Sequence, residues 1–125
     1  MISFRQFLTE SVIKTADEIY DYVRSIHPRY EDWEEGDLEK RIYKYKRYEL
    51  KEVLVDDIDV AYNVNDDFVA DLALEIENGK KINPVVLHQE LSYYDVIDGC
   101  HRVEAYKDEG KKYITTYVAI QSKRK

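Results

Sequence analysis

The chain has 125 residues, of which 44% are hydrophobic and 36% are charged. This balance excludes an intrinsically disordered chain, and the length suits one domain with a modest core. The formal net charge of −7 argues against a nucleic-acid binder that works through overall electrostatics, because such proteins gain affinity by contacting phosphates with cations.

Cysteine and histidine usage limits the chemistry further. Cys100 is the single cysteine, so neither an internal disulfide nor a cysteine-based zinc cluster is possible. The three histidines show no metal-ligand spacing. Residues 1–8 lack the apolar run of a secretory signal, and no run of 18 apolar residues is present. We therefore expect a cytoplasmic protein with no membrane segment.

Residues 1–44 are expected to form a helical extension with an acidic connector. Apolar spacing predicts a short amphipathic helix over 3–10 and a longer helix over 15–26, which Thr15 or Asp17 caps. The acidic connector follows over 29–37, and residues 37–44 fit either a helix or a strand.

From residue 45 the pattern changes to strands alternating with helices, and we expect one domain over 45–121. The expected elements are a strand over 48–55, a helix from Asn65 or Asp66 to Asn78, strands over 84–88 and 93–97, a helix over 100–109, and a strand over 113–120. This order predicts an α+β fold in which helices pack on a small mixed sheet.

The junction at which the strand over 93–97 runs through Asp98 and Gly99 into a helix carries the most information. Glycine permits a tight turn, and the start of a helix offers unpaired N–H groups and a positive dipole end to anions. Arg102 offers a bidentate fork for phosphate, and His101 offers a hydrogen bond or a proton. The pattern therefore predicts an anion site that fits phosphate, with Asp98 available for Mg²⁺, for orienting His101 or as a base.

The same residues also fit a structural junction. Asp98 can cap the helix, and Arg102 can pair with Glu104 or another surface acid. Cys100 has two interpretations as well. A thiol at a helix N-terminus beside His101 has a lowered pKa and is nucleophilic, whereas a small buried thiol that fits the turn is inert.

Residues 49–120 resemble the ParB/sulfiredoxin superfamily. The matching pieces are a strand and turn over 53–58, a helix over 69–79, a strand over 84–87, the signature turn over 98–105 and the closing strand over 113–120. The resemblance implies the ParB/sulfiredoxin-like fold and the binding of nucleotide phosphate, with ATP or another nucleotide and Mg²⁺ as the ligands.

The run Gly-Cys-His-Arg at 99–102 is similar to that of sulfiredoxins, in which the cysteine is the nucleophile and the His and Arg positions bind nucleotide phosphate. ParB proteins carry Gly-Glu-Arg-Arg at this turn and bind CTP, and related free-serine kinases carry Asp-Gly-His-His-Arg. Sulfiredoxins usually have glycine where this chain has Asp98. Asp-Gly-X-His-Arg is closer to the kinase and phage-type members, which do not need the cysteine.

The leading hypothesis is a nucleotide-binding domain that hydrolyses or transfers phosphate from ATP or a related nucleotide. The residues assigned to this site are Gly99, Cys100 and His101 as the phosphate nest, Arg102 as the phosphate partner, Asp98 for Mg²⁺ or proton transfer, Lys80 and Lys81 on the same face, and Glu104 as support for Arg102. Asp98, Cys100 and His101 are the candidate catalytic groups.

Three other functions stay open. A sulfiredoxin-type reductase would use Cys100, and a ParB-like nuclease would use Asp98 with a metal. A non-enzymatic module would bind a host protein or a nucleic acid, with the acidic segment 31–39 as its contact surface. The basic and aromatic stretch 40–48 fits a grip on a nucleic-acid backbone or an edge strand that lysines protect from aggregation.

Residues 1–10 resemble the leader of internal head proteins of tailed bacteriophages, and 8–10 resemble the cleavage site of their head protease. The resemblance implies a protein that is packaged in the phage head and injected into the host. The alternative is an ordinary short helix that covers the core.

Overall fold

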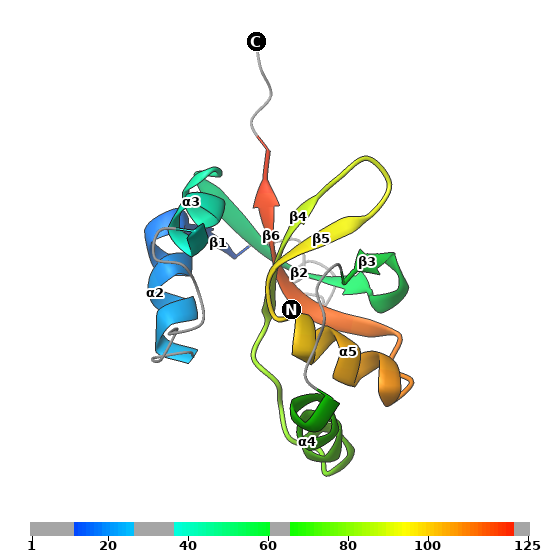
Figure 1. The fold of residues 1–125 in the computed structure, drawn as a ribbon. Coiled ribbons are helices and arrows are strands. Elements are labelled where there is room, and N and C mark those ends of the chain that lie inside the picture. Colours follow the sequence, from blue (N-terminus) through cyan, green and yellow to red (C-terminus); the bar gives the residue numbers. More distant parts are fainter. Residues whose placement is uncertain (1–11, 27–36, 61–65, 122–125) are drawn as a thin grey trace, which may run out of the picture.

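The computed structural model describes residues 12–26, 37–60 and 66–121, and Figure 1 shows their arrangement. The elements are β1 (Ile13–Thr15), α2 (Ala16–Ile26), α3 (Asp37–Tyr43), β2 (Arg47–Leu54), the 3₁₀ turn η1 (Val55–Asp57), β3 (Ile58–Asp59), α4 (Asp66–Glu77), β4 (Val85–Gln89), β5 (Tyr94–Asp98), α5 (Cys100–Asp108) and β6 (Tyr113–Ile120). The expected α+β class is confirmed.

A single six-stranded mixed sheet, in the order β1-β2-β6-β4-β5-β3, organises the described residues. β6 lies inside the sheet, where it pairs antiparallel with all eight residues of β2 and parallel with β4. β5 pairs antiparallel with β4 and parallel with β3. The Asp98 end of β5 therefore lies beside the start of β4, close to the middle of the sheet.

Helices cover both faces of this sheet, with α2 and α3 on one side and α5 and α4 on the other (Figure 1). The first layer buries Ile19 and Val23 of α2 and Ile42 of α3 against Val86 and Ile97 of the sheet. The second layer buries α5 through Val103 against β4, β5 and β6, and α4 packs on α5 through Val69, Ile76 and Ala105. Both layers contribute to one folded unit, so α2 and α3 of the predicted extension lie on the same sheet as the predicted domain.

The start of α2 shows how local sequence sets an element. The Thr15 N–H donates to Glu18 Oε1 (2.8 Å), and the Glu18 N–H donates to Thr15 Oγ1 (3.2 Å). This reciprocal capping box satisfies two N–H groups that the helix leaves unpaired. Of the two predicted caps, Thr15 is the one used, while Asp17 accepts a hydrogen bond from the Tyr43 hydroxyl.

The structure departs from the predicted elements in four places. β1 and β3 were not predicted, the ambiguous stretch over 37–44 forms α3, and Val55 opens η1 instead of ending the strand. The predicted helix over 3–10, its phage-leader interpretation and most of the acidic connector fall on residues outside the described ranges. Within those ranges, no helix combines the length and the apolar character needed to cross a membrane.

Candidate functional site

Gly99 joins β5 to α5 with a backbone conformation that other residues rarely adopt. Its φ is +117°, and it occupies the N-cap position of α5. A Cβ at this position would lie 2.5 Å from Val85 Cγ1 and 3.1 Å from Arg102 Nη2. The turn therefore requires glycine for its backbone angle and for the close approach of β4.

The Arg102 side chain points into the protein and makes buried contacts on the inner side of this turn. The side chains of Arg102 and Asp98 are only 7% and 4% exposed, and Nη2 pairs with Asp98 Oδ2 at 2.5 Å. Nη1 donates to the carbonyl oxygens of Asn83 and Pro84, each at 2.9 Å. Both arms of the guanidinium are thus engaged within the protein. The segment that leads into β4 is tied to the first turn of α5.

The predicted partnership between Glu104 and Arg102 needs correction. Glu104 Oε2 lies 3.7 Å from Lys107 Nζ, one turn further along α5, whereas Arg102 pairs with Asp98. The physical reason is burial: an ion pair inside the protein needs a partner that is also inside, and Glu104 is only half-buried.

Tyr22 extends the same network to the opposite layer. Its hydroxyl donates to the Pro84 carbonyl, which also accepts from Arg102. Burial raises the pKa of Tyr22 to about 12, against the lowering effect of the Arg102 guanidinium. Sequence reasoning missed Tyr22, since nothing in the linear pattern relates it to residue 84. A helix of the predicted extension therefore contacts the candidate site directly.

Cys100 opens α5 and is half-buried. Burial raises the pKa of its thiol from 9.0 to about 11, with Arg41 lowering it and Asp98 raising it to lesser extents. The thiolate is the nucleophilic form of cysteine, and on the order of one thiol in ten thousand is ionised at pH 7 with such a pKa. The environment of Cys100 favours the inert interpretation over the nucleophilic one.

We therefore expect Cys100 to react slowly with iodoacetamide at neutral pH. The rate should rise about tenfold per pH unit and show no plateau below about pH 10, because only the thiolate reacts. Alkylation rates between pH 6 and 10.5, measured by mass spectrometry on the folded chain, test this expectation. A plateau near pH 7 would mean that the thiol is activated.

His101 and Phe68 mark the outer side of the turn. The His101 ring meets the Phe68 ring edge-on, with centroids 5.6 Å apart and an interplanar angle of 87°. Phe68 lies on α4 and is 60% exposed, and His101 is half-buried. The backbone ladder of α5 begins with Val103 N–H donating to the Gly99 carbonyl (3.0 Å), so the amides of 100–102 precede the ladder. The partly exposed surface here combines a helix start with an imidazole.

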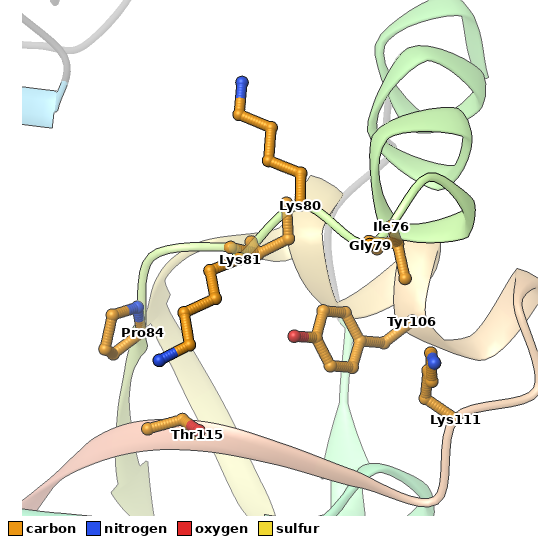
Figure 2. A pocket seen from close by; sticks show the side chains of 9 residues that line it. Ile76, Gly79, Lys80, Lys81, Pro84, Tyr106, Lys111 and Thr115 are labelled. Atoms are coloured by element: carbon orange, nitrogen blue, oxygen red, sulfur yellow. The ribbon is translucent and has the colours of Figure 1, made fainter.

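A cavity of about 380 Å³ opens beside α5, and three lysines line it (Figure 2). Its wall consists of Ile76, Gly79, Lys80, Lys81, Ile82, Pro84, Tyr106, Lys111 and Thr115. Lys81 extends across the cavity toward Thr115, while Lys80 points away from it (Figure 2) and lies 3.5 Å from Glu75. Among the described residues, this wall has three lysines and no acidic side chain, which makes it basic in a chain whose net charge is negative.

The predicted site residues therefore divide into groups. Asp98, Gly99 and Arg102 meet in the turn, and His101 lies on its outer side. Lys80 and Lys81 were expected on the same face as the turn. They line the cavity, and residues 98–102 are not part of the wall that the structure describes. Pro84 belongs to both places, because it lines the cavity and its carbonyl accepts from Arg102.

Comparison with solved structures shows the fold. Sulfiredoxin from Arabidopsis thaliana is similar with a TM-score of 0.50 and 20% identity, over 58% of this chain and 85% of that chain. The C-terminally truncated chromosome-partitioning protein ParB from Caulobacter crescentus, solved with CTP-gamma-S, gives a TM-score of 0.49 and 16% identity over 58% and 45% of the two chains. A Pnob8-like ParB-N domain gives a TM-score of 0.45 and 20% identity over 60% of this chain and 31% of that chain.

The comparable region thus spans less than half of either ParB chain. No curated protein matches the sequence. The model of the ParB N-terminal domain matches residues 39–125, which include β2 to β6 and the whole turn. The chain therefore belongs to the ParB N-terminal domain family.

Proposed function

We propose that this chain is a nucleotide-binding domain whose phosphate site is the outer side of the β5–Gly99–α5 turn. The observation that carries the proposal is the network beneath the turn. Arg102 binds Asp98 and the carbonyl oxygens of Asn83 and Pro84, and this fixes the first turn of α5 at the end of β5. A helix start held in place, with its backbone N–H groups and positive dipole end, is suited to bind phosphate.

The roles that follow differ in part from those expected from the sequence. Gly99, Cys100 and His101 are all partly exposed at the start of α5, and their amides are the proposed phosphate donors. The His101 side chain adds a hydrogen bond or a positive charge. Arg102 becomes a positioning residue, because its guanidinium is already engaged below the turn. Sequence reasoning had assigned Arg102 to the phosphate itself.

Asp98 is also better suited to a structural role. Its carboxylate is 4% exposed and pairs with Arg102, which leaves it poorly placed to bind Mg²⁺ or to remove a proton. Mg²⁺ would then enter with the nucleotide, as the counter-ion that its phosphates carry. With Cys100 protonated at neutral pH, the geometry favours nucleotide binding over sulfiredoxin-type reduction.

The lysine-lined cavity supplies a second anionic contact in this proposal. A volume of about 380 Å³ lies within the usual range of small-ligand sites, which is roughly 300–1,000 Å³. Lys81 crosses the cavity, and Tyr106 and Thr115 add hydroxyl groups to the wall. We assign Lys81 to the nucleotide or to the acceptor of its phosphate. Lys80, which points away, contributes general positive charge.

Thermal shift with ATP, ADP, CTP and GTP, each with and without Mg²⁺, tests the proposal. CTP belongs in the panel because the turn resembles that of ParB proteins. A ligand at 100 times its Kd stabilises a protein by about 2.7 kcal/mol, which moves the Tm of a domain of this size by several degrees. We expect the active nucleotide to give such a shift at millimolar concentration, and phosphate release in the same samples reports any hydrolysis.

Three variants locate the site. His101→Ala should lose most of the shift and Lys81→Ala part of it. Lys51→Ala is the matched control, because Lys51 is exposed on β2 and is not part of the cavity wall. No shift with any nucleotide would overturn the proposal. An undiminished shift in both His101→Ala and Lys81→Ala would place the nucleotide elsewhere.

A further inference from the structure

The hairpin of β4 and β5 brings together one imidazole and two carboxylates, which none of the comparisons assigns to a function. His88 pairs directly with Asp95 across the two strands. Glu90 follows His88 by two residues, and its N–H donates to the Tyr93 carbonyl to close the hairpin (2.8 Å). Cross-strand partners and residues two apart share a face of a sheet, so the backbone brings the three side chains to one place.

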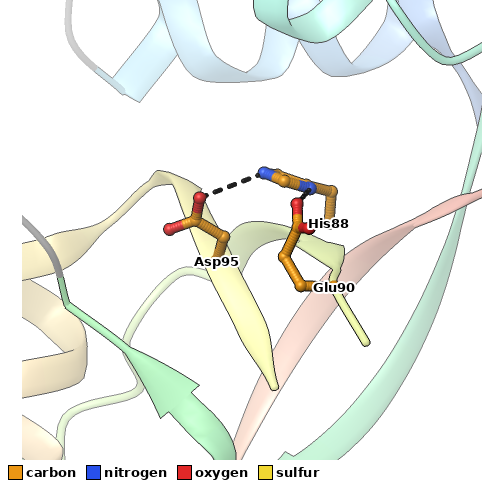
Figure 3. A group of neighbouring side chains, drawn as sticks. All are labelled: His88, Glu90 and Asp95. Atoms are coloured by element: carbon orange, nitrogen blue, oxygen red, sulfur yellow. Dashed lines mark ion pairs between the residues drawn. The ribbon is translucent and has the colours of Figure 1, made fainter. Parts of the chain in front are cut away.

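Figure 3 shows the resulting cluster, in which the imidazole lies between the two acids. Nδ1 of His88 is 3.0 Å from Glu90 Oε2, and Nε2 is 3.3 Å from Asp95 Oδ2. One ring nitrogen and one oxygen from each acid all lie within 4.8 Å of one another. Each of the three donor groups therefore lies close to the other two.

Tyr45 also contacts the His88 ring. Tyr45 stacks on it, with centroids 5.8 Å apart and an interplanar angle of 25°. The Tyr45 hydroxyl lies 3.3 Å from Nδ1. The His88 side chain is 13% exposed, whereas Asp95 and Glu90 are 30% and 42% exposed. The cluster thus joins a fixed imidazole to two carboxylates that water can reach and that can adjust.

This donor set has a chemical preference. Zn²⁺ binds histidine nitrogen and carboxylate oxygen at about 2.0–2.2 Å, so tetrahedral donors lie about 3.4 Å apart. The present separations need a contraction of about 1.4 Å at most, which the exposed Glu90 side chain can supply. Mg²⁺ and Ca²⁺ prefer oxygen ligands alone, whereas an imidazole favours first-row transition metals.

We propose that His88, Glu90 and Asp95 form a binding site for a divalent first-row transition metal. One His88 nitrogen and the two carboxylates are the protein ligands, and water or another ligand completes the coordination. The two carboxylate charges balance the charge of the ion, and Tyr45 orients the imidazole. This site is distinct from the nucleotide site, because Asp95 precedes Asp98 by three residues along β5, roughly 10 Å of extended strand.

The test is calorimetric titration of the full, untagged and chelator-treated chain with Zn²⁺. We expect one Zn²⁺ per chain. Removing an outer hydrogen-bond partner of a metal ligand costs roughly 10- to 100-fold in affinity, so Asp95→Asn and His88→Gln should each cost about 100-fold or more. Glu90→Gln should cost about tenfold, since its carboxylate is the most exposed of the three. The absorption of bound Co²⁺ should be lost in the same variants.

Glu52→Gln is the matched control, because Glu52 is an exposed carboxylate on β2 outside the cluster, and its Zn²⁺ affinity should equal that of the unaltered chain. Far-UV circular dichroism verifies that each variant is folded. If His88→Gln does not fold, the Zn²⁺ affinity of Asp95→Asn decides the result. The site would be overturned if the chain bound no Zn²⁺ or if it bound Mg²⁺ equally well. It would also be overturned if both Asp95→Asn and Glu90→Gln left the affinity for Zn²⁺ unchanged. The cluster would then be an ion-pair group that locks the hairpin.

Discussion

Replacing Arg102 with methionine is expected to cost about 3–5 kcal/mol of folding free energy. The substitution preserves much of the side-chain volume and removes the charge, so Asp98 remains buried without its guanidinium partner. The carbonyl oxygens of Asn83 and Pro84 lose a donor as well. Urea unfolding followed by circular dichroism measures the loss, which would be a large part of the stability of a domain of this size.

Lys107→Met is the matched control on the same helix. Lys107 and Glu104 are 3.7 Å apart and partly exposed, so this pair should contribute less than about 1 kcal/mol. In the double variant Asp98→Asn/Arg102→Met the total loss should be smaller than the sum of the single losses, since no buried charge then remains. Equal effects of Arg102→Met and Lys107→Met would show that the buried pair does not hold the turn.

Gly99→Ala is expected to destabilise the fold by about 3 kcal/mol or more. A φ of +117° strains any residue with a side chain, at a cost of roughly 1–3 kcal/mol. The new methyl group would also lie 2.5 Å from Val85 Cγ1 and 2.8 Å from Val85 Cβ, and overpacking of this kind adds roughly 1–3 kcal/mol. The unfolding midpoint in urea should fall accordingly.

Gly110→Ala separates these two contributions. Gly110 ends α5 with a φ of +71°, and a Cβ there would meet no atom within 4 Å. The Gly110→Ala substitution should therefore lower the folding free energy only by the conformational strain, about 1–2 kcal/mol. If Gly99→Ala and Gly110→Ala destabilise equally, then contact with Val85 is not what demands glycine at the turn.

The order of strands and helices after residue 45 was accessible from sequence because each element carries a strong local signal. β6 combines β-branched and aromatic residues and was predicted with its observed bounds, and Gly110 was identified as the end of α5. β1 gives no such signal, because it has three residues and exists through its pairing with β2. The helix–strand ambiguity of α3 was resolved by tertiary packing, which buries Leu38 and Ile42.

The candidate site was harder to predict for a related reason. Sequence reasoning identified the turn, but it could not tell which way the Arg102 side chain points. Asp98 lies on β5 and Arg102 on α5, so their contact depends on the turn at Gly99 and not on a helical repeat. The cluster of His88, Glu90 and Asp95 was missed because Asp95 reaches His88 across the hairpin, and no spacing along the chain reveals that contact.

The position of β6 inside the sheet has a consequence for how the domain is made. Among the described strands, β6 comes last along the chain, and it joins β1 and β2 to β4, β5 and β3. Until it leaves the ribosome, the nascent chain can form only two partial sheets, each with an unpaired edge facing where β6 will lie. Pairing strands so distant in sequence slows folding and exposes such edges to aggregation. Chaperones should therefore be needed to cover these unpaired edges until β6 is in place.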